Sequence, residues 1–277
     1  MENARYDNLT VVITGATSAF GRGSALRFAA GGAAVVLAGR SEHLLVEIAK
    51  ECEAAGGRVL AIPTDVTEER EVEQLAQSAV REFGRIDVWV NNAGSGAIGS
   101  FADVPLEDHV RVIRTDLLGT IFGCYFAIRQ FRRQGTGVLI NVASVVGKVP
   151  APYLASYVAA KHGVVGLGAA LRQELQEAKV STIHVCTLMP ATFDTPVFEH
   201  AAQYASADET GIPPLNDSQD IVEAIVGLAT DPQDELSVGS AAKVSVFAHQ
   251  FFPGLVESYM AKETHKAERQ SAGREVV

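Results

Sequence analysis

The sequence predicts an α/β fold in which one doubly wound parallel sheet carries helices on both of its faces. Short apolar runs rich in β-branched residues alternate with longer segments of helical periodicity along almost the whole chain. The apolar runs are continuous rather than interrupted by polar residues, which is typical of strands buried on both faces. Strands that alternate with helices form βαβ units, and the strands of such units run parallel.

The first half of the chain contains four expected strands and three expected helices. The strands cover residues 9–13, 33–38, 58–62 and 86–90. The helices cover residues 23–30, 42–55 and 68–83. This order is that of consecutive βαβ units.

The second half continues the same rhythm. We expect helices over residues 106–132, 156–179 and 220–229, and strands over residues 137–142, 182–188 and 243–247. Pro105 stands near the first turn of the first of these helices, and either Asp217 or Ser218 caps the last one. No change of composition separates two cores, so we expect one domain over residues 1–260, followed by a polar, flexible tail over residues 261–277.

Residues 191–216 form a long segment with three prolines and no strand signal. A segment of this kind is typical of a substrate lid. Its four large apolar or aromatic residues are Phe193, Val197, Phe198 and Tyr204. They indicate either an apolar or aromatic substrate or the packing of the lid on the core.

Composition and charge exclude several classes of protein. The chain has 277 residues, 47% of them hydrophobic, and a net charge of −10, which disfavours binding to nucleic acids. The three cysteines are far apart, so neither a disulfide framework nor a zinc site is predicted. No apolar run approaches the roughly 20 residues of a membrane span, and the start of the chain does not resemble a signal peptide. We therefore expect a soluble, cytoplasmic protein without a membrane partner.

A glycine-rich turn follows the first expected strand. A strand, a glycine turn and a helix, in this order, are the context of a dinucleotide-binding fingerprint, in which a pyrophosphate lies at the helix N-terminus. The expected cofactor-binding residues of this turn are Gly15, Thr17, Ser18, Phe20 and Gly21. The alternative is an ordinary glycine-rich βα turn.

The middle glycine of such fingerprints is absent here, because Ser18 and Ala19 occupy the two candidate positions. If that position requires a positive φ, the methyl group of Ala19 costs up to about 1 kcal/mol.

The second expected strand ends in Gly39 and Arg40. In dinucleotide folds this strand end faces the adenosine ribose, and an acidic residue there binds the 2′-hydroxyl of NAD. No carboxylate stands at Gly39, and the planar fork of Arg40 suits a 2′-phosphate. The sequence therefore favours NADP (NADPH) as cofactor over NAD, although Arg40 could also be a solvated residue at a strand end.

Tyr157 and Lys161 are four residues apart on an expected helix and so share one face. A lysine ammonium beside a phenol lowers the pKa of the tyrosine and makes it a better acid/base at working pH. Ser144, at the end of a strand, could donate to a substrate oxygen. Taken alone, the Tyr-x-x-x-Lys pattern would rather indicate an ordinary surface pair.

Several motifs together resemble the short-chain dehydrogenase/reductase family in its compact single-domain branch. They are the glycine turn, Asn91-Asn92-Ala93-Gly94 directly after a strand, Asp65-Val66 after another strand, Ser144 thirteen residues before Tyr157, Tyr157-x-x-x-Lys161, and the segment from Pro190 to Thr195. The resemblance covers about residues 8 to 250 and implies a Rossmann-like fold.

The resemblance implies roles for single residues. Tyr157 would be the catalytic acid/base, Lys161 would lower its pKa and bind the nicotinamide ribose, and Ser144 would hold the substrate oxygen. Further cofactor contacts would come from Asp65, Val66, Asn91, Ala93, Gly94, Pro190 and Thr195. The implied reaction passes a hydride between nicotinamide C4 and the carbon of a small-molecule carbonyl or alcohol, while the tyrosine moves the proton.

Family members usually form dimers or tetramers. The resemblance therefore implies a homodimer or homotetramer, with residues 106–132 and 156–179 supplying the contact between subunits. The apolar segment 251–260 would dock either on a neighbouring subunit or on its own substrate pocket.

The chain departs from the family pattern at Ala19, at Ala191 and at Asp116. The family usually has Asn at the position of Asp116, where it helps to hold a water that links the lysine to solvent. An ionised Asp116 cannot donate a hydrogen bond and would raise the pKa of Tyr157, against Lys161. Two hypotheses follow: an active oxidoreductase with modest loss, which we favour, or a cofactor-binding sensor or scaffold with weak or no catalysis.

Overall fold

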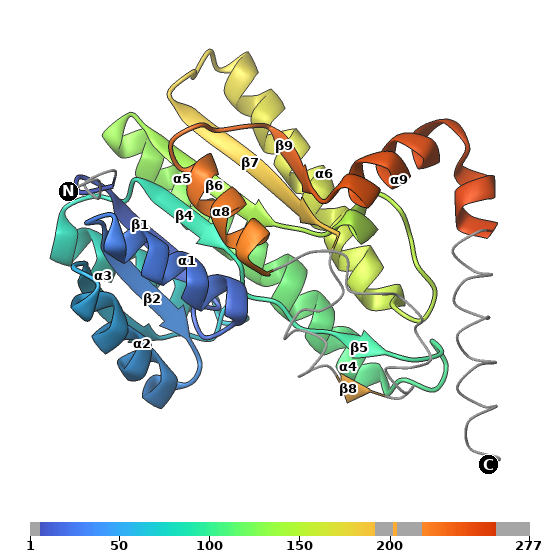
Figure 1. The fold of residues 1–277 in the computed structure, drawn as a ribbon, viewed down its shortest axis with the longest axis horizontal. Helices are drawn as coiled ribbons and strands as arrows, with labels where there is room; N and C mark the ends of the chain where they lie inside the picture. Colours follow the sequence, from blue (N-terminus) through green and yellow to red (C-terminus); the bar gives the residue numbers. More distant parts are fainter. Residues whose placement is uncertain (1–5, 192–201, 204–217, 259–277) are drawn as a thin grey trace.

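The computed structural model describes residues 6–191, 202–203 and 218–258, and all statements below refer to these residues. Seven parallel strands form one sheet in the order β3-β2-β1-β4-β6-β7-β9 (Figure 1). The α/β class with a doubly wound parallel sheet is confirmed.

Most elements lie close to their predicted positions. The strands of the sheet are β1 (Thr10–Thr14), β2 (Ala34–Gly39), β3 (Arg58–Pro63), β4 (Val88–Asn91), β6 (Gly137–Val142), β7 (Ile183–Pro190) and β9 (Glu235–Val238). The helices are α1 (Ala19–Ala30), α2 (Glu42–Ala54), α3 (Glu69–Phe83), α4 (Leu106–Val112), α5 (Gly119–Gln134), α6 (Ala155–Glu177), α8 (Ser218–Leu228) and α9 (Ser240–Phe251).

Each face of the sheet carries its own hydrophobic core, because successive residues of a strand point to opposite faces. On one face, Val11 and Ile13 of β1 belong to the core that includes α1, α2 and α8. On the other face, Val12 and Trp89 belong to the core that includes α3, α5 and α6. The central strands are therefore buried on both sides, as their continuous apolar runs indicate.

The strand order reverses beside β1, and this reversal positions the site. The chain passes from β1 to β2 and β3 on one side, then returns to β4 on the other side. In open parallel sheets, ligands bind in the crevice at the carboxyl ends of the strands where the order reverses. A ligand site is therefore expected where β1 to β4 end.

The expected helix over residues 106–132 is divided by a π-helical turn, Ile113–Leu118, between α4 and α5. Asp116 lies in this turn and is fully buried. The hydroxyl of Thr120 donates to the backbone carbonyl of Asp116 over 2.7 Å. π-Helical turns within helices occur frequently at functional sites.

The prediction of the last strand is wrong. Residues 243–247 lie inside α9, and the last strand of the sheet is β9, which pairs with the end of β7. A short apolar run cannot be assigned to a strand or a helix from periodicity alone. Ala241 and Ala242, just before the run, favour a helix, and Gly239 turns the chain from β9 into α9 with a φ of 106°.

Part of the expected lid forms a short strand that the sequence did not indicate. Ala202–Gln203 is β8, which pairs in parallel with β5, Ala97–Ile98. Apart from Ala191, the rest of the lid, including its four large apolar residues and Thr195, lies outside the described residues. Asp217 and the expected tail also lie outside them, while α8 begins at Ser218.

A membrane-spanning helix must be both long and apolar. Among the described helices, none combines the necessary length with the necessary apolar composition.

Candidate functional site

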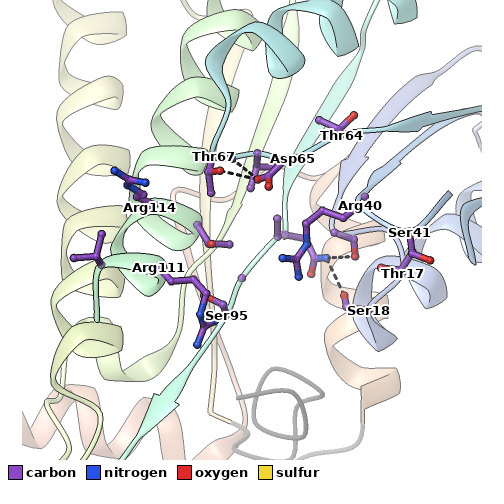
Figure 2. A pocket seen from close by; sticks show the side chains of 18 of the residues that line it. Thr17, Ser18, Arg40, Ser41, Thr64, Asp65, Thr67, Ser95, Arg111 and Arg114 are labelled. Carbon is purple, nitrogen blue, oxygen red and sulfur yellow. Dashed lines mark hydrogen bonds between the residues drawn. The ribbon is translucent and has the colours of Figure 1, made fainter. Parts of the chain in front are cut away.

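A cleft of about 970 Å³ opens at the carboxyl ends of β1 to β4 (Figure 2). Eight of the expected cofactor-binding residues line it: Gly15, Thr17, Ser18, Arg40, Asp65, Val66, Ala93 and Gly94. The sheet thus brings together residues from four separate strand ends.

The glycine turn is held against the loop that follows β4. Gly15 has a φ of 63°, and a Cβ at this position would lie 2.7 Å from the Cα of Ala93. A Cβ at Gly21 would lie 2.2 Å from the carbonyl oxygen of Gly15. Both positions therefore require glycine, one for its conformation and both for the close approach of backbone to backbone.

Ser18 is the N-cap of α1, and its hydroxyl accepts from the amide of Gly21 over 3.2 Å. The helix begins at Ala19, whose φ is not positive. The absence of a middle glycine therefore causes no backbone strain, because the position is helical. The first turn of α1 contains no acidic residue, which suits an anion at this helix N-terminus.

Asn92 ties the glycine turn to the next loop. Its side-chain amide lies 3.1 Å from the carbonyl of Thr14, 3.0 Å from that of Gly15 and 3.1 Å from the hydroxyl of Ser18. In the other direction, the hydroxyl of Thr14 accepts from the backbone amides of Asn92 and Ala93. These hydrogen bonds hold the glycine turn and the loop after β4 in place as one wall of the cleft.

The end of β2 exposes a cation to the cleft. Arg40 is exposed and makes no hydrogen bond or ion pair with another described residue. Ser41, the N-cap of α2, also lines the cleft, and its side chain makes no capping hydrogen bond within the described chain. Figure 2 shows Arg40 on the same wall as Thr17 and Ser18. Arg40 and Ser41 can therefore bind an anion.

Asp65, after β3, is held in a turn by Thr67. Its Oδ1 accepts from the amide and the hydroxyl of Thr67 over 2.9 and 2.8 Å, as the dashed lines in Figure 2 mark. The amide of Asp65 donates to Glu71 over 2.6 Å. Val66 lies beside it, packed so closely on Gly119 that a Cβ there would lie 2.8 Å from the Val66 side chain.

Three expected cofactor residues from the glycine turn and the end of β4 do not line the cleft. Phe20 packs its side chain into the core. Gly21 lies behind the turn, where the lack of a side chain leaves room for the carbonyl of Gly15. Asn91 is buried and turned inward, where it accepts from the indole of Trp89 over 2.8 Å and donates to Asn141 over 2.9 Å.

The sequence analysis missed several residues on the opposite wall of the cleft. Ser95, Arg111, Arg114 and Thr115 line it, and they come from the loop before β5 and from α4 and the π-helical turn. Arg111 is occupied by Asp108 and by the carbonyl of Gly96. Only the spacing of the three residues after Ser95 along a helix could have suggested them, and it does not show which side of the helix faces the cleft. Ser95 lies in a loop and carries no such signal.

The expected catalytic residues, to which Asp116 also belongs, lie close together, and none of them lines the cleft. Tyr157, Lys161 and Ser144 are buried, with exposed fractions of 7%, 5% and 7%. The Nζ of Lys161 lies 5.3 Å from the centre of the Tyr157 ring and donates to the carbonyl of Val142 over 3.1 Å. The hydroxyl of Ser144 accepts from the amide of Val146 over 3.3 Å, and Ser144 also forms a side-chain hydrogen bond with Tyr157.

Asp116 forms an ion pair with Lys161. Its Oδ2 lies 3.3 Å from Lys161 Nζ, and its Oδ1 accepts from the amide of Ser95 over 2.7 Å. Burial raises the pKa of the Asp116 carboxyl above its ordinary value, although Lys161 and Ser95 act in the opposite direction. Burial lowers the pKa of Lys161, but Asp116 and Tyr157 more than offset this effect, so the pKa lies above its ordinary value.

The pKa of Tyr157 reflects the same balance. Burial raises it, the positive charge of Lys161 lowers it, the carboxylate of Asp116 raises it, and a hydrogen bond with Ser144 lowers it. The net pKa lies above that of a free tyrosine. Lys161 and Asp116 therefore act on the phenol in opposite directions.

Pro190 ends β7, and the amide of the next residue, Ala191, donates to Val238 at the end of β9. These residues lie at the carboxyl edge of the sheet, although outside the cleft. An apolar cluster surrounds Tyr157 and includes Ile98, Val146 and Leu154.

A family model described as short chain dehydrogenase matches residues 9–205. The chain belongs to this family. The resemblance to the short-chain dehydrogenase/reductase family is thus confirmed.

Among the similar proteins, two match this chain over most of their own length. The uncharacterized oxidoreductase YxnA of Bacillus subtilis strain 168 is 33% identical over 274 residues, which cover 96% of this chain and 76% of that protein. The 3beta-hydroxysteroid dehydrogenase 1 of Eggerthella lenta is 35% identical over 238 residues, covering 82% of this chain and 89% of that protein.

Solved structures with a similar fold support the assignment to this family. A short-chain dehydrogenase/reductase of Burkholderia phymatum in complex with NAD has a TM-score of 0.83 and 25% identity, covering 91% of this chain and 96% of that one. A variant of actinorhodin polyketide ketoreductase with NADPH has a TM-score of 0.75 and 28% identity, covering 87% and 99%. The chain is thus an NAD(P)-dependent oxidoreductase that acts on a CH–OH or C=O group.

Proposed function

We propose that this chain is an NADP-dependent oxidoreductase that interconverts a carbonyl and an alcohol. The observation on which this proposal rests is the buried group of Ser144, Tyr157 and Lys161 at the carboxyl edge of the sheet, next to a cleft into which β2 presents an arginine that pairs with no other described residue. The proposed enzyme is one domain over residues 1–260.

Tyr157 is the proposed acid/base. In the direction of reduction its phenol gives a proton to the carbonyl oxygen of the substrate, and the nearby ammonium of Lys161 stabilises the phenolate that remains. Ser144 uses its hydroxyl proton to hold the same oxygen. The nicotinamide cofactor, when bound, supplies or accepts the hydride.

The residues that line the cleft fit a dinucleotide. Gly15, Thr17 and Ser18 would hold the pyrophosphate at the N-terminus of α1, where backbone amides and hydroxyls can donate. Asp65 and Val66 would contact the adenine, and Ala93 and Gly94 would lie along the ribose. Phe20, Gly21 and Asn91 act indirectly, through the shape of the turn and the end of β4.

The preference for NADP rests on Arg40. An exposed guanidinium that no other described residue engages can form a charge-assisted pair with a 2′-phosphate, and Ser41 adds a hydroxyl beside it. An acidic residue, which would repel the phosphate, is absent from the described residues that line this wall of the cleft, Gly39 to Ser41. NAD remains the less favoured cofactor in this proposal.

We propose an apolar or aromatic small molecule as substrate, since Tyr157 lies in an apolar cluster. Lys161 and Thr195 complete the proposed cofactor site on its nicotinamide side, together with Pro190, although Thr195 lies outside the described residues.

We also propose a homodimer or homotetramer. Leu118, Ile121 and Tyr125 expose 38%, 36% and 51% of their surfaces along the π-helical turn and α5, where they would meet a second subunit. The cytoplasmic location and the absence of a nucleic-acid partner stay predictions.

The decisive test is NADPH consumption against a panel of ketones, quinones and aldehydes, with the wild-type chain and Tyr157→Phe. Tyr6→Phe is the matched control, because Tyr6 is also buried but packs against Phe28 in the core that includes α1, α2 and α8, apart from the cluster around Tyr157. Turnover by wild type and the control, but not by Tyr157→Phe, supports the proposal. NADPH binding without turnover of any compound would favour the sensor or scaffold instead.

A further inference from the structure

Ser95 connects the cofactor cleft with the buried ion pair. It directly follows the Asn-Asn-Ala-Gly loop, and Figure 2 shows it on the cleft wall beside Arg111. Its amide donates to Oδ1 of Asp116 over 2.7 Å, and its hydroxyl lies 3.3 Å from the same oxygen. One residue thus touches both the cleft and the carboxylate.

The other carboxylate oxygen of Asp116 faces Lys161 at 3.3 Å. The backbone carbonyl of Asp116 already accepts the hydroxyl of Thr120 over 2.7 Å. Asp116 therefore acts on Lys161 through its carboxylate, and the strength of that action depends on whether the carboxylate is ionised.

Few groups surround this carboxylate. Lys161, from α6, is the cation that acts on it, and Tyr157, from the same helix, is the other titratable group that it influences. Ser95 approaches from the loop after β4 with two donors, and Gly94 packs its backbone beside Oδ2. Among the described residues that influence the ionisation of Asp116, Ser95 is thus the one that lines the cleft.

We propose that Ser95 is a positioning residue, which holds the Asp116 carboxylate against Lys161 and thereby sets the pH at which Tyr157 works. This inference rests on the proposed acid/base role of Tyr157. It extends that role to a residue outside the Ser-Tyr-Lys group.

The direction follows from charge. A hydroxyl that donates to a carboxylate favours its ionised form. Without that hydroxyl, Asp116 holds its proton more readily, and a neutral Asp116 no longer opposes the field of Lys161 at Tyr157. The phenol then ionises at lower pH, as the pKa contribution of Asp116 to Tyr157 indicates.

The test is kcat for alcohol oxidation against pH, in wild type, Ser95→Ala, Asp116→Asn and the double variant. Ser95→Ala should move the rise of kcat to lower pH by at most about one unit, because the loss of one hydrogen bond changes the pKa of Asp116 by about that much, and by less than Asp116→Asn does. The same substitution should cause no shift in the Asp116→Asn background. The KM of the substrate and the plateau of kcat should not change.

Two further variants test the hydroxyl itself. Ser95→Thr keeps the donor and should behave as wild type, whereas Ser95→Cys keeps the size with a weak donor and should shift in the direction of Ser95→Ala. NADPH titration and thermal unfolding of each variant show that fold and cleft are intact.

Superimposable profiles of wild type and Ser95→Ala would overturn the inference, as would an equal shift with and without Asp116. If the proposed function were wrong, a different result would show it, because Tyr157→Phe would then retain turnover. The two results are therefore distinguishable.

Discussion

Arg40→Ala should weaken NADPH binding by about 10- to 70-fold and leave NADH binding almost unchanged. Arg40 makes no ion pair with another described residue, so its guanidinium does not need to break an existing contact before it binds a phosphate. The variant removes the cation, while the backbone of β2 and the rest of the cleft stay in place.

The magnitude follows from the exposure of Arg40. A hydrogen bond to a charged group contributes about 1.5–3 kcal/mol. Arg40 is exposed, so solvent and salt screen the interaction, and the lower part of this range, about 1.5–2.5 kcal/mol, applies. At about 1.4 kcal/mol per factor of ten, this range corresponds to about 10- to 70-fold.

The assay is fluorescence titration of both cofactors at two salt concentrations. Arg133→Ala is the matched control, because Arg133 is also exposed but lies in the last turn of α5. The difference between the cofactors should shrink at high salt, and Arg40→Lys should lose part of the affinity because it keeps the charge without the fork. An equal loss for NADPH and NADH, or none for either, would refute the assignment of Arg40.

Three other variants test the site. Tyr157→Phe removes the transferable proton and should reduce turnover by about 10²–10⁴-fold with intact NADPH binding, and near wild-type turnover would exclude Tyr157 as acid/base. Asp116→Asn removes the charge that raises the pKa of Tyr157, so the alkaline rise of kcat for alcohol oxidation should move to lower pH, and an unmoved profile would mean that Asp116 carries no effective charge. Gly15→Ala should lower the free energy of unfolding in urea by more than Gly84→Ala does, and the Gly84 variant should lose roughly 1 kcal/mol. Both glycines have a positive φ, but only at Gly15 would an added Cβ meet backbone within 3 Å. Equal losses of stability in the two variants would contradict the close approach at Gly15.

The sheet could be predicted because its signal is local. A central strand such as β1 is continuously apolar, since both of its faces are buried, and each helix begins where this pattern stops. The C-terminal error has the opposite cause. The run over residues 243–247 is too short for its periodicity to decide, and the true last strand, β9, is an edge strand with a weak apolar signal.

The glycine turn could be located, but its details could not. Ala19 looks like a defect in the fingerprint, whereas the structure places it in the first turn of α1, where a positive φ is not required. Phe20 and Asn91 stand in cofactor motifs, yet their side chains point into the core. A motif locates the backbone near a ligand, and only packing decides where each side chain turns.

The far wall of the cleft was beyond sequence analysis for a physical reason. Arg111 and Thr115 reach the cleft only because α4 and the π-helical turn pack beside the loop after β4. Ser95 is similar, since its partner Asp116 is 21 positions away in the chain. Contacts of this kind depend on how elements meet, which no local pattern contains.

The aspartate at position 116, where the family usually has asparagine, can stabilise the fold and at the same time hinder the ionisation of Tyr157. A buried lysine without a counter-charge is costly, and the carboxylate 3.3 Å from Lys161 reduces that cost. The same carboxylate opposes the field with which Lys161 acts on Tyr157. Asp116→Asn should therefore ionise Tyr157 more easily and yet unfold at lower denaturant concentration. If the variant were as stable as wild type, the ion pair would contribute nothing to the fold, and Asp116 could be explained only by its effect on the reaction.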